Sequence, residues 1–234
     1  MKRSIESLTG YSIGGTDGVI GSVGELYFDD MTWQIRYWVI DTGKWLPGRK
    51  VLIPPQVILG LDWKNKIIET SLTIHQIKNS PAPDADKPVS LQEESKSFGY
   101  SPNYWFLPAM NDEVGLTNQP GGDSLPNCHL RSSRALIGYQ VQGRDNYLGT
   151  ITDFIIEFDT QKLSHIVVDG RAWLHSNYLL IGVESVLRIE WATSSMTVEL
   201  GKVEVKDFGR YNPCDGINVL MDGSYLDYHG RPAK

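Results

Sequence analysis

An internal repeat constrains the fold of this 234-residue chain more than any other feature of its sequence. When the chain is aligned with itself at an offset of 128 residues, identical residues fall into one register without a gap. The matches include Gly10-Tyr11 with Gly138-Tyr139, Gly15 with Gly143, Asp17 with Asp145, Gly21 with Gly149, Val39 with Val167, Asp41 with Asp169, Trp45-Leu46 with Trp173-Leu174, Leu52-Ile53 with Leu180-Ile181, and Trp63 with Trp191. Self-similarity of this kind indicates a duplicated structural unit. The chain is therefore expected to contain two copies of one small domain.

Each copy has the pattern of short strands separated by turns. Alternating apolar and polar residues, with many β-branched and aromatic side chains, are typical of strands. They predict strands at residues 19–28, 34–41, 57–63 and 66–72 in the first copy, and at 147–156, 162–169, 185–191 and 194–200 in the second. The turn Thr16-Asp17-Gly18 predicts a hairpin of type I′ geometry. Several short strands with regular turns favour a small closed or nearly closed barrel, so the predicted class is all-β.

Four segments follow from the repeat. Residues 1–80 are predicted to form the first barrel and residues 131–208 the second. A connector at 81–130 begins as a polar, Pro-rich linker, then carries a short amphipathic helix at 89–98 and an aromatic cluster. Within it, residues 111–127 are expected to be flexible. The C-terminal extension at 209–234 echoes the connector, so each barrel is expected to be followed by a short helical extension.

Charge and cysteine content narrow the class of protein. The net charge is −6, most of it in the connector, and no cluster of Lys and Arg forms a basic face for nucleic acid. The two cysteines, Cys128 and Cys214, lie outside the repeated cores, which favours a reducing cytoplasm over a disulfide-stabilised secreted domain. The N-terminus does not resemble a signal peptide, and no apolar stretch approaches the length that spans a bilayer. A soluble cytoplasmic protein is expected.

The residues with catalytic potential have structural explanations. The five histidines are scattered without the spacing of a metal site. No Ser or Cys lies in a nucleophile motif. The repeated pairs Asp17/Asp145 and Asp41/Asp169 begin a turn and end a strand, where capping explains them. We therefore predict no catalytic residues, no metal and no cofactor.

Aromatic side chains outside the predicted strands are the candidate interaction residues. Trp45 and Trp173 lie in equivalent loops, and each is followed by Leu. Tyr104, Trp105 and Phe106 form the cluster in the connector. Because aromatic anchors dominate the binding energy of interfaces, these five residues are predicted to make contacts. The loop residues have the alternative of packing against their own barrel, and the cluster either joins the two barrels or lies across a homodimer.

The motifs resemble those of a known family. The resemblance rests on Gly10-Tyr11, Ile13, Thr16-Asp17-Gly18, Ile20-Gly21, Ile35-Arg36-Tyr37, Val39-Ile40-Asp41-Thr42, Trp45 through Pro54, Ile77 through Pro81, and Asp227 through Pro232. This pattern is similar to the PRC-barrel family, and within it to the tandem bacterial proteins labelled photosystem reaction centre H-like. Copy two departs from it at Gly170-Arg171-Ala172 and at Gly182, where copy one has Pro54. The resemblance implies two small PRC-type β-barrels in tandem, used as interaction modules.

Two functions remain open at this point. The first is a non-enzymatic module for protein interaction or assembly, self-associating as a homodimer and binding a protein partner in solution or peripherally at a membrane surface. The second is a small-molecule-binding protein or enzyme that uses the cleft between the two barrels, because pockets favour domain interfaces.

Overall fold

The computed structural model describes residues 2–43, 49–83, 88, 129–170 and 178–201, with the backbone of 210–211, 218–219 and 225–226. We call the described residues up to 83 the first half and those from 129 onward the second half. The first half contains β1 (Lys2–Ser4), α1 (Ile5–Leu8), β2 (Ser12–Gly15), β3 (Gly18–Asp29), β4 (Ile35–Asp41), β5 (Lys50–Ile53), η1 (Pro55–Val57), β6 (Ile58–Asp62), β7 (Ile67–Thr70) and α2 (Ile74–Lys78).

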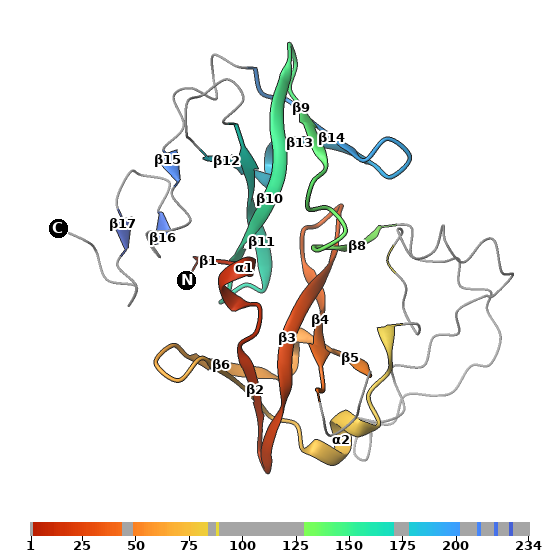
Figure 1. The fold of residues 1–234 in the computed structure, drawn as a ribbon, viewed down its shortest axis with the longest axis vertical. Coiled ribbons are helices and arrows are strands. Elements are labelled where there is room, and N and C mark those ends of the chain that lie inside the picture. Colours follow the sequence, from red (N-terminus) through yellow and green to blue (C-terminus); the bar gives the residue numbers. More distant parts are fainter. Residues whose placement is uncertain are drawn as a thin grey trace, which may run out of the picture.

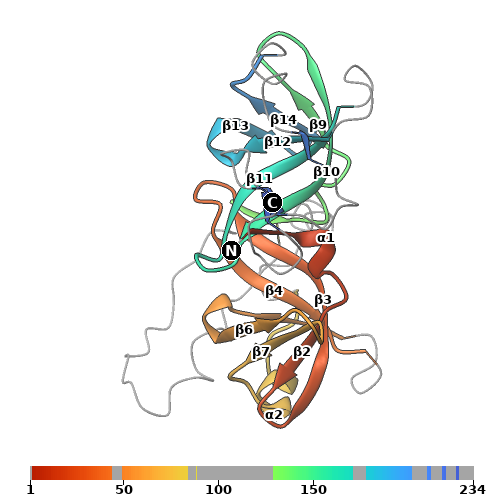
Figure 2. The same ribbon diagram turned by 90° about the vertical axis from the view of Figure 1, so that its left-hand side faces the viewer.

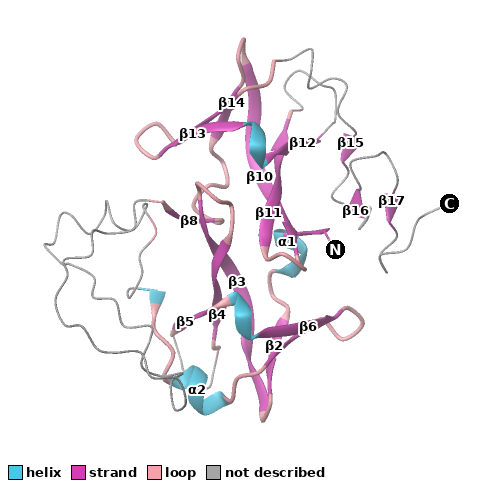
Figure 3. Ribbon diagram, turned by 180° about the vertical axis from the view of Figure 1, so that it is seen from behind, coloured by secondary structure: helices cyan, strands magenta, loops and turns pink. Residues whose placement is uncertain are grey.

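The second half repeats the order of the strands, with turns at residues 133–138 in place of α1 and three further short strands at its C-terminal end. It contains β8 (Leu130–Ser132), β9 (Gln140–Gln142), β10 (Tyr147–Glu157), β11 (Lys162–Asp169), β12 (Tyr178–Gly182), η3 (Val183–Ser185), β13 (Val186–Glu190), β14 (Ser195–Val198), β15 (Arg210–Tyr211), β16 (Asn218–Val219) and β17 (Tyr225–Leu226). The predicted strands are confirmed, with ends that differ by at most two residues. Figure 3 shows that strands dominate both halves and that helices are short. The all-β class is therefore confirmed.

Each half is built on one sheet. In the first half the strands lie in the order β5-β4-β3-β2-β7-β6, and in the second half in the order β13-β14-β9-β10-β11-β12-β15. Neighbouring strands are antiparallel except for the parallel pairs β2 with β7 and β9 with β14. The two long strands, β3 and β10, run along the length of the molecule, one in each half (Figure 1). The repeat in the sequence is thus a repeat of the whole sheet.

The halves exchange their first strands. β1 belongs to the first half in sequence but pairs antiparallel with β10, where Arg3 lies opposite Ile156. Reciprocally, β8 pairs with β3, where Arg131 lies opposite Phe28. Figure 1 shows β1 and α1 beside the second half, and β8 beside the end of β3. Figure 2 shows the N-terminus at the level where the halves meet. Each sheet is therefore completed by a strand from the other copy.

An approximate two-fold axis relates the halves and passes between Gln34 and Lys162. These residues are equivalent at the offset of 128, and they form an isolated antiparallel bridge with each other. On either side of the bridge the backbone contacts are reciprocal. The amide of Ile35 donates to the Gln161 carbonyl at 2.9 Å, and the amide of Leu163 donates to the Trp33 carbonyl at 2.8 Å. Since both bonds join equivalent atoms, the contact between the halves imitates that of a symmetric dimer.

The hydrophobic core is continuous across this contact. One cluster of buried side chains contains residues of both sheets. At the junction the rings of Phe28 and Phe154 are 5.8 Å apart, and Phe28 also stacks on Trp33 at 5.3 Å. The indole N–H of Trp38 donates to the Gln161 side-chain oxygen at 2.9 Å. Because burial of such aromatic surface is a main source of stability, each half depends on the other for part of its core.

The first hairpin differs from its predicted geometry. β2 and β3 pair as expected around Thr16 and Asp17, but neither residue has a positive φ, so the type I′ prediction is wrong. Asp17 instead accepts a hydrogen bond from the amide of Ile74 at 2.8 Å, at the start of α2. This contact ties the hairpin to the helix, which explains the aspartate without a type I′ turn.

Some predictions fall on residues that the structure does not describe. The helix at 89–98 and the flexible segment at 111–127 lie outside the described residues. α2 follows the last strand of the first half, while its counterpart in the second half would begin at residue 202, which is also outside. Among the described residues, no helix has the length and apolar character to cross a membrane.

Candidate functional site

Two β-bulges aim a carboxylate from each half at the contact between the halves. The pairing of β3 with β4 shifts register between Val23 and Glu25, and that of β10 with β11 shifts between Ile151 and Asp153. The extra residues, Gly24 and Thr152, are equivalent at the offset of 128. A bulge bends the strand and redirects the side chain beside it. Glu25 and Asp153 therefore occupy matching positions on either side of the approximate two-fold axis.

The carboxylate of Asp153 holds the exchanged segment of the first half. Its oxygens accept hydrogen bonds from the Ser4 hydroxyl, from the amide of Glu6 at 3.1 Å and from the amide of Phe154 at 2.7 Å. Ser4 is the N-cap of α1. We call the contact of Asp153 with Ser4 the second clamp. Because Asp153 is 5% exposed, it joins β10 to the start of α1 away from solvent.

Glu25 holds the exchanged segment of the second half in the same way. It accepts a hydrogen bond from the Ser132 hydroxyl, and Ser132 is the counterpart of Ser4. We call this contact the first clamp. The neighbouring Ser133 hydroxyl accepts from the amide of Leu26 at 3.0 Å. The Lys50 ammonium lies 3.7 Å from a Glu25 oxygen, so this carboxylate also has a cation beside it.

A pocket of about 210 Å³ lies beside both clamps. It is lined by Glu6, Thr9, Gly24, Glu25, Ser133, Arg134, Ile137, Thr152, Asp153 and Phe154. Eight of these residues form pairs at the offset of 128: Glu6 with Arg134, Thr9 with Ile137, Gly24 with Thr152, and Glu25 with Asp153. The pocket, which we call the seam pocket, therefore straddles the approximate two-fold axis and takes its walls from both halves.

The electrostatics of the seam pocket are set by burial. Desolvation raises the pKa of the Asp153 carboxyl from 3.8 to about 6, although hydrogen bonds from Ser4, Phe154 and Glu6 favour the charged form. The nearby negative charge of Glu6 raises it further. A carboxyl with a pKa near 6 changes charge close to neutral pH. Such a group in a pocket is a candidate for function, and structural networks produce the same shift.

A second titratable group lies near the exchanged strand β1. His165 on β11 is 5% exposed, and burial lowers the pKa of its imidazole to about 4. The positive charge of Lys2 lowers it further, while Glu184 and Glu157 oppose the shift. Nδ1 of His165 lies 2.9 Å from the Ser164 hydroxyl oxygen. At neutral pH this histidine is therefore uncharged.

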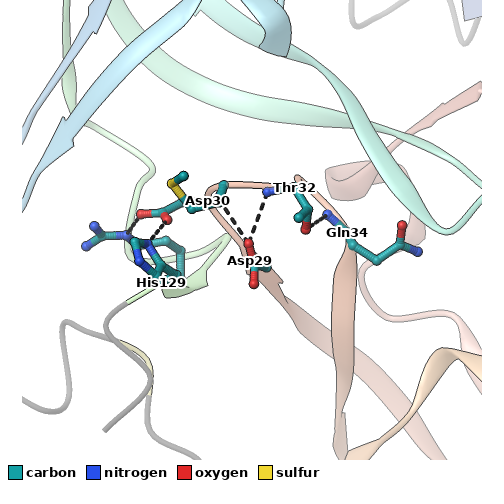
Figure 4. A network of polar contacts seen from close by, with 7 residues as sticks. Asp29, Asp30, Thr32, Gln34 and His129 are labelled. Carbon is teal, nitrogen blue, oxygen red and sulfur yellow. Dashed lines mark hydrogen bonds and ion pairs between the residues drawn. The ribbon is translucent and has the colours of Figure 1, made fainter. Parts of the chain in front are cut away.

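A polar network fixes the start of β8 against the turn after β3. Figure 4 shows Asp30 beside His129, and the guanidinium of Arg131 pairs with the same carboxylate. Its oxygens lie 2.9 Å from Nδ1 of His129 and 2.5 Å from Nε of Arg131. In the same turn Asp29 accepts from the amides of Met31 and Thr32, each at 3.0 Å. These contacts hold the exchanged strand β8 in place. They give a structural role to His129, which is the one histidine beside a cysteine in the sequence.

The predicted interaction residues are not tested by the structure. Trp45, Tyr104, Trp105, Phe106 and Trp173 all lie outside the described residues. Among the described residues, no group of three or more His, Cys, Asp and Glu side chains is arranged to hold a metal ion.

Trp63, directly after β6, packs against the hydrophobic core. Its ring also receives the guanidinium of Arg3 at 3.8 Å from the ring centroid. Arg3 is buried and lies on the exchanged strand β1, so this cation–π contact attaches β1 to the first half as well.

The seam pocket was missed at the sequence level, although it lies in the predicted cleft between the barrels. Glu25 and Asp153 are matched by the offset but differ in type, and the search for identical pairs passes over them. Glu6 and Arg134 carry opposite charges and are missed for the same reason. A comparison of equivalent positions by charge and hydrogen-bonding capacity would have singled out both pairs.

Comparison with known proteins identifies both copies. A family model described as PRC-barrel domain matches residues 2–74 and residues 130–206. Each matched segment begins with the strand that is exchanged, β1 in the first and β8 in the second. No curated protein matches the sequence.

Proposed function

Since the chain belongs to the PRC-barrel family in both of its halves, we propose that it is a non-enzymatic module for protein interaction and assembly. The proposal includes a cytoplasmic location in a bacterium, self-association as a homodimer and a protein partner. It also includes the finer resemblance to tandem proteins of the photosystem reaction centre H-like type. Fold alone does not establish function, so the support has to come from particular surface residues.

The main support is an apolar side chain repeated on the outer strand of each sheet. β6 ends the strand order of the first sheet and β13 that of the second. Leu59 on β6 is 67% exposed, and its counterpart Leu187 on β13 is 63% exposed. Single exposed leucines are common on protein surfaces. An exposed leucine kept at the same position in both copies, on a strand that ends its sheet, favours a contact surface that occurs twice.

A second repeated position supports the same proposal. Val19 at the start of β3 is 61% exposed, and its counterpart Tyr147 on β10 is 37% exposed. The two copies thus present apolar residues at two pairs of equivalent positions. A bivalent surface of this kind binds a symmetric partner more tightly than either copy alone, provided that both sites are reached together.

The test is the double variant Leu59→Asp with Leu187→Asp in the tagged full-length chain. We expect it to lose its partner on affinity capture from native cells, with soluble and membrane fractions analysed separately, and to shift toward monomer in analytical ultracentrifugation. Met31→Asp is the matched control, because Met31 is 71% exposed and its counterpart is already Asp159. Equal capture and self-association by the double variant and the control would remove the leucines from the proposal.

The aromatic residues predicted from the sequence are part of the proposal and are tested by a separate variant. Trp105→Ala is expected to weaken self-association or partner binding and to leave the thermal unfolding of the barrels unchanged. If Trp105→Ala associates as strongly as wild type in the same ultracentrifugation series, the contact surface consists of other residues.

A second candidate function is binding of a small molecule between the halves. The observation that favours it is the seam pocket, which lies at the predicted cleft and contains a carboxyl whose pKa is raised to about 6. A thermal-shift screen of metabolites and metal ions with the full chain tests this candidate. No stabilisation by any compound would count against it.

A further inference from the structure

The rim of the seam pocket carries two opposite charges at equivalent positions. Glu6 and Arg134 are related by the offset of 128, line the same pocket and are both exposed. Within the described part of the chain, neither side chain forms a hydrogen bond or an ion pair, although the backbone amide of Glu6 bonds to Asp153. The pocket therefore has a carboxylate and a guanidinium in its wall, and each is able to bind a ligand.

The remaining walls divide the pocket into a polar and an apolar side. Glu25 and Asp153 add carboxyl groups near the clamps, and Thr9 adds a hydroxyl. Ile137, which is 45% exposed, and the buried ring of Phe154 supply apolar surface. The volume of about 210 Å³ leaves room for a small ligand.

These charges discriminate between classes of small ligand. A simple anion is attracted by Arg134 and repelled by Glu6, Glu25 and ionised Asp153. A simple cation is attracted by the carboxylates and repelled by Arg134. A molecule with an ammonium group at one end and a carboxylate at the other satisfies both sides, and its carboxylate matches the bidentate donors of a guanidinium.

We propose that the seam pocket binds a small zwitterion of the amino-acid type, with its ammonium group toward Glu6 and its carboxylate on Arg134. The proposal rests on the second candidate function and names its ligand class. Arg134 belongs to the second half and Glu6 to the first, so a bound zwitterion connects the two exchanged segments. Binding therefore stabilises the contact between the halves, by an amount that grows with the ratio of free ligand to Kd.

The experiment uses the full chain and a defined series of probes. Glycine, β-alanine, 4-aminobutyrate and 5-aminopentanoate place the two charges at increasing separation, while butylamine and butyrate carry one charge each. At constant ionic strength and pH 7, we expect at least one zwitterion to raise the melting temperature and to bind in titration calorimetry. Butylamine and butyrate are expected to bind at least tenfold more weakly than that zwitterion.

Variants at the rim test the assignment of the two charges. Glu6→Arg and Arg134→Glu each give the rim a single sign of charge and are expected to weaken zwitterion binding at least tenfold. The double variant exchanges the charges between equivalent positions, so it is expected to recover binding with the ligand reversed. Glu69→Arg and Arg36→Glu are matched controls, because both residues are exposed and lie outside the pocket lining. Glu6→Gln and Arg134→Gln serve if a charge-reversed chain fails to fold.

Three results would overturn the proposal. The first is equal binding of butylamine and the zwitterions, which would make the pocket a cation site. The second is a double variant that binds no better than the single variants. The third is a metabolite screen that yields a ligand while the whole zwitterion series fails, in which case the second candidate function stands and the zwitterion assignment does not.

Discussion

The two clamps share one geometry and differ in charge. In the first clamp, Glu25 accepts from Ser132 and has the Lys50 ammonium at 3.7 Å. In the second clamp, Asp153 accepts from Ser4 and from two backbone amides. The position equivalent to Lys50 is Tyr178, which carries no positive charge at neutral pH. Hydrogen bonds therefore offset the burial of Asp153 only in part, with no cation beside it, and burial raises its pKa.

The turns that contact the exchanged strands also differ in charge between the two halves. In the first half Asp30 pairs with His129 and Arg131 on the incoming segment. The equivalent position in the second half is Phe158, whose ring lies 6.0 Å from that of Trp38. The two halves thus share the backbone path of the exchange, while the first half has ion pairs where the second half has an apolar contact. The halves are equivalent in fold and differ in the charged groups beside their exchanged strands.

The largest expected effect comes from the glycines at which β3 and β10 approach the neighbouring strands. A Cβ at Gly149 would overlap the Asp169 carbonyl, and Gly149 also has a φ of +148°. A Cβ at the equivalent Gly21 would overlap the Asp41 carbonyl, without a positive φ. We expect Gly149→Ala to cost about 3 kcal/mol and Gly21→Ala about 2 kcal/mol, measured by urea unfolding.

The same unfolding curves test whether the halves are one cooperative unit. Because the core is continuous, each glycine variant is expected to shift one common transition. Two separated transitions, with only the mutated half destabilised, would show that the exchange couples the halves weakly.

Asp153→Asn is expected to remove one component of the pH dependence. The folded protein binds a proton at Asp153 below about pH 6, while the unfolded chain binds it only below about 3.8, so this carboxyl adds stability as the pH falls from 6 to 4. Asn keeps the size of the side chain and can bond to Ser4. The free energy of unfolding of the variant relative to wild type should be highest at pH 7 and should fall by on the order of 2 kcal/mol by pH 4. A difference that does not vary with pH would contradict the raised pKa.

His165→Gln is expected to change the pH dependence in the opposite direction. The pKa of His165 is about 4 in the folded protein, below its ordinary 6.5, so the unfolded chain binds the proton first and stability is lost as the pH falls from 6.5 to 4. Urea unfolding at several pH values should show that the variant resists acid better than wild type. In wild type, Asp153 and His165 change the stability in opposite directions as the pH falls. If His165→Gln loses as much stability in acid as wild type does, the histidine does not contribute to this pH dependence.

Tyr178→Lys is the smallest change and tests the comparison of the clamps directly. It places a cation where Lys50 stands in the first half, so the pKa of Asp153 should fall by about one unit. A carboxyl-carbon NMR titration of wild type and variant measures this shift. Tyr147→Lys on the same half is the control, because Tyr147 lies outside the pocket lining. Equal pKa values of Asp153 in all three proteins would mean that the missing cation does not explain the difference between the clamps.

Much of each sheet was predictable because local patterns decide it. The alternation in 19–28 and 147–156 specifies β3 and β10, and the β-branched run of 162–169 specifies β11. The hairpin at Thr16-Asp17 was located correctly, but its turn type was not, and Asp17 bonds to the start of α2, 57 residues away in the sequence. Local preference therefore placed the element, while a contact distant in sequence accounts for the aspartate.

The exchange of β1 and β8 was not predictable from these patterns. A three-residue strand carries too little periodicity to identify its partner. At an offset of 128, Arg3 matches Arg131 and Ser4 matches Ser132, but these identities mark equivalent positions and do not indicate which strand each segment pairs with. Glu25 and Asp153 share no identity. The offset thus revealed two copies of one fold and gave no information on how they are joined.

The sequence alone determined the repeat, the strand pattern and the family. Each of these features is visible in neighbouring positions or in positions separated by one constant offset. The reciprocal strands, the two clamps and the seam pocket were decided by tertiary structure. They depend on which distant backbone groups find hydrogen-bond partners and on which carboxylates lose water when the halves close on each other. Burial of Asp153 without a nearby lysine is the clearest case, since two of its hydrogen-bond partners, Ser4 and Glu6, come from the other half.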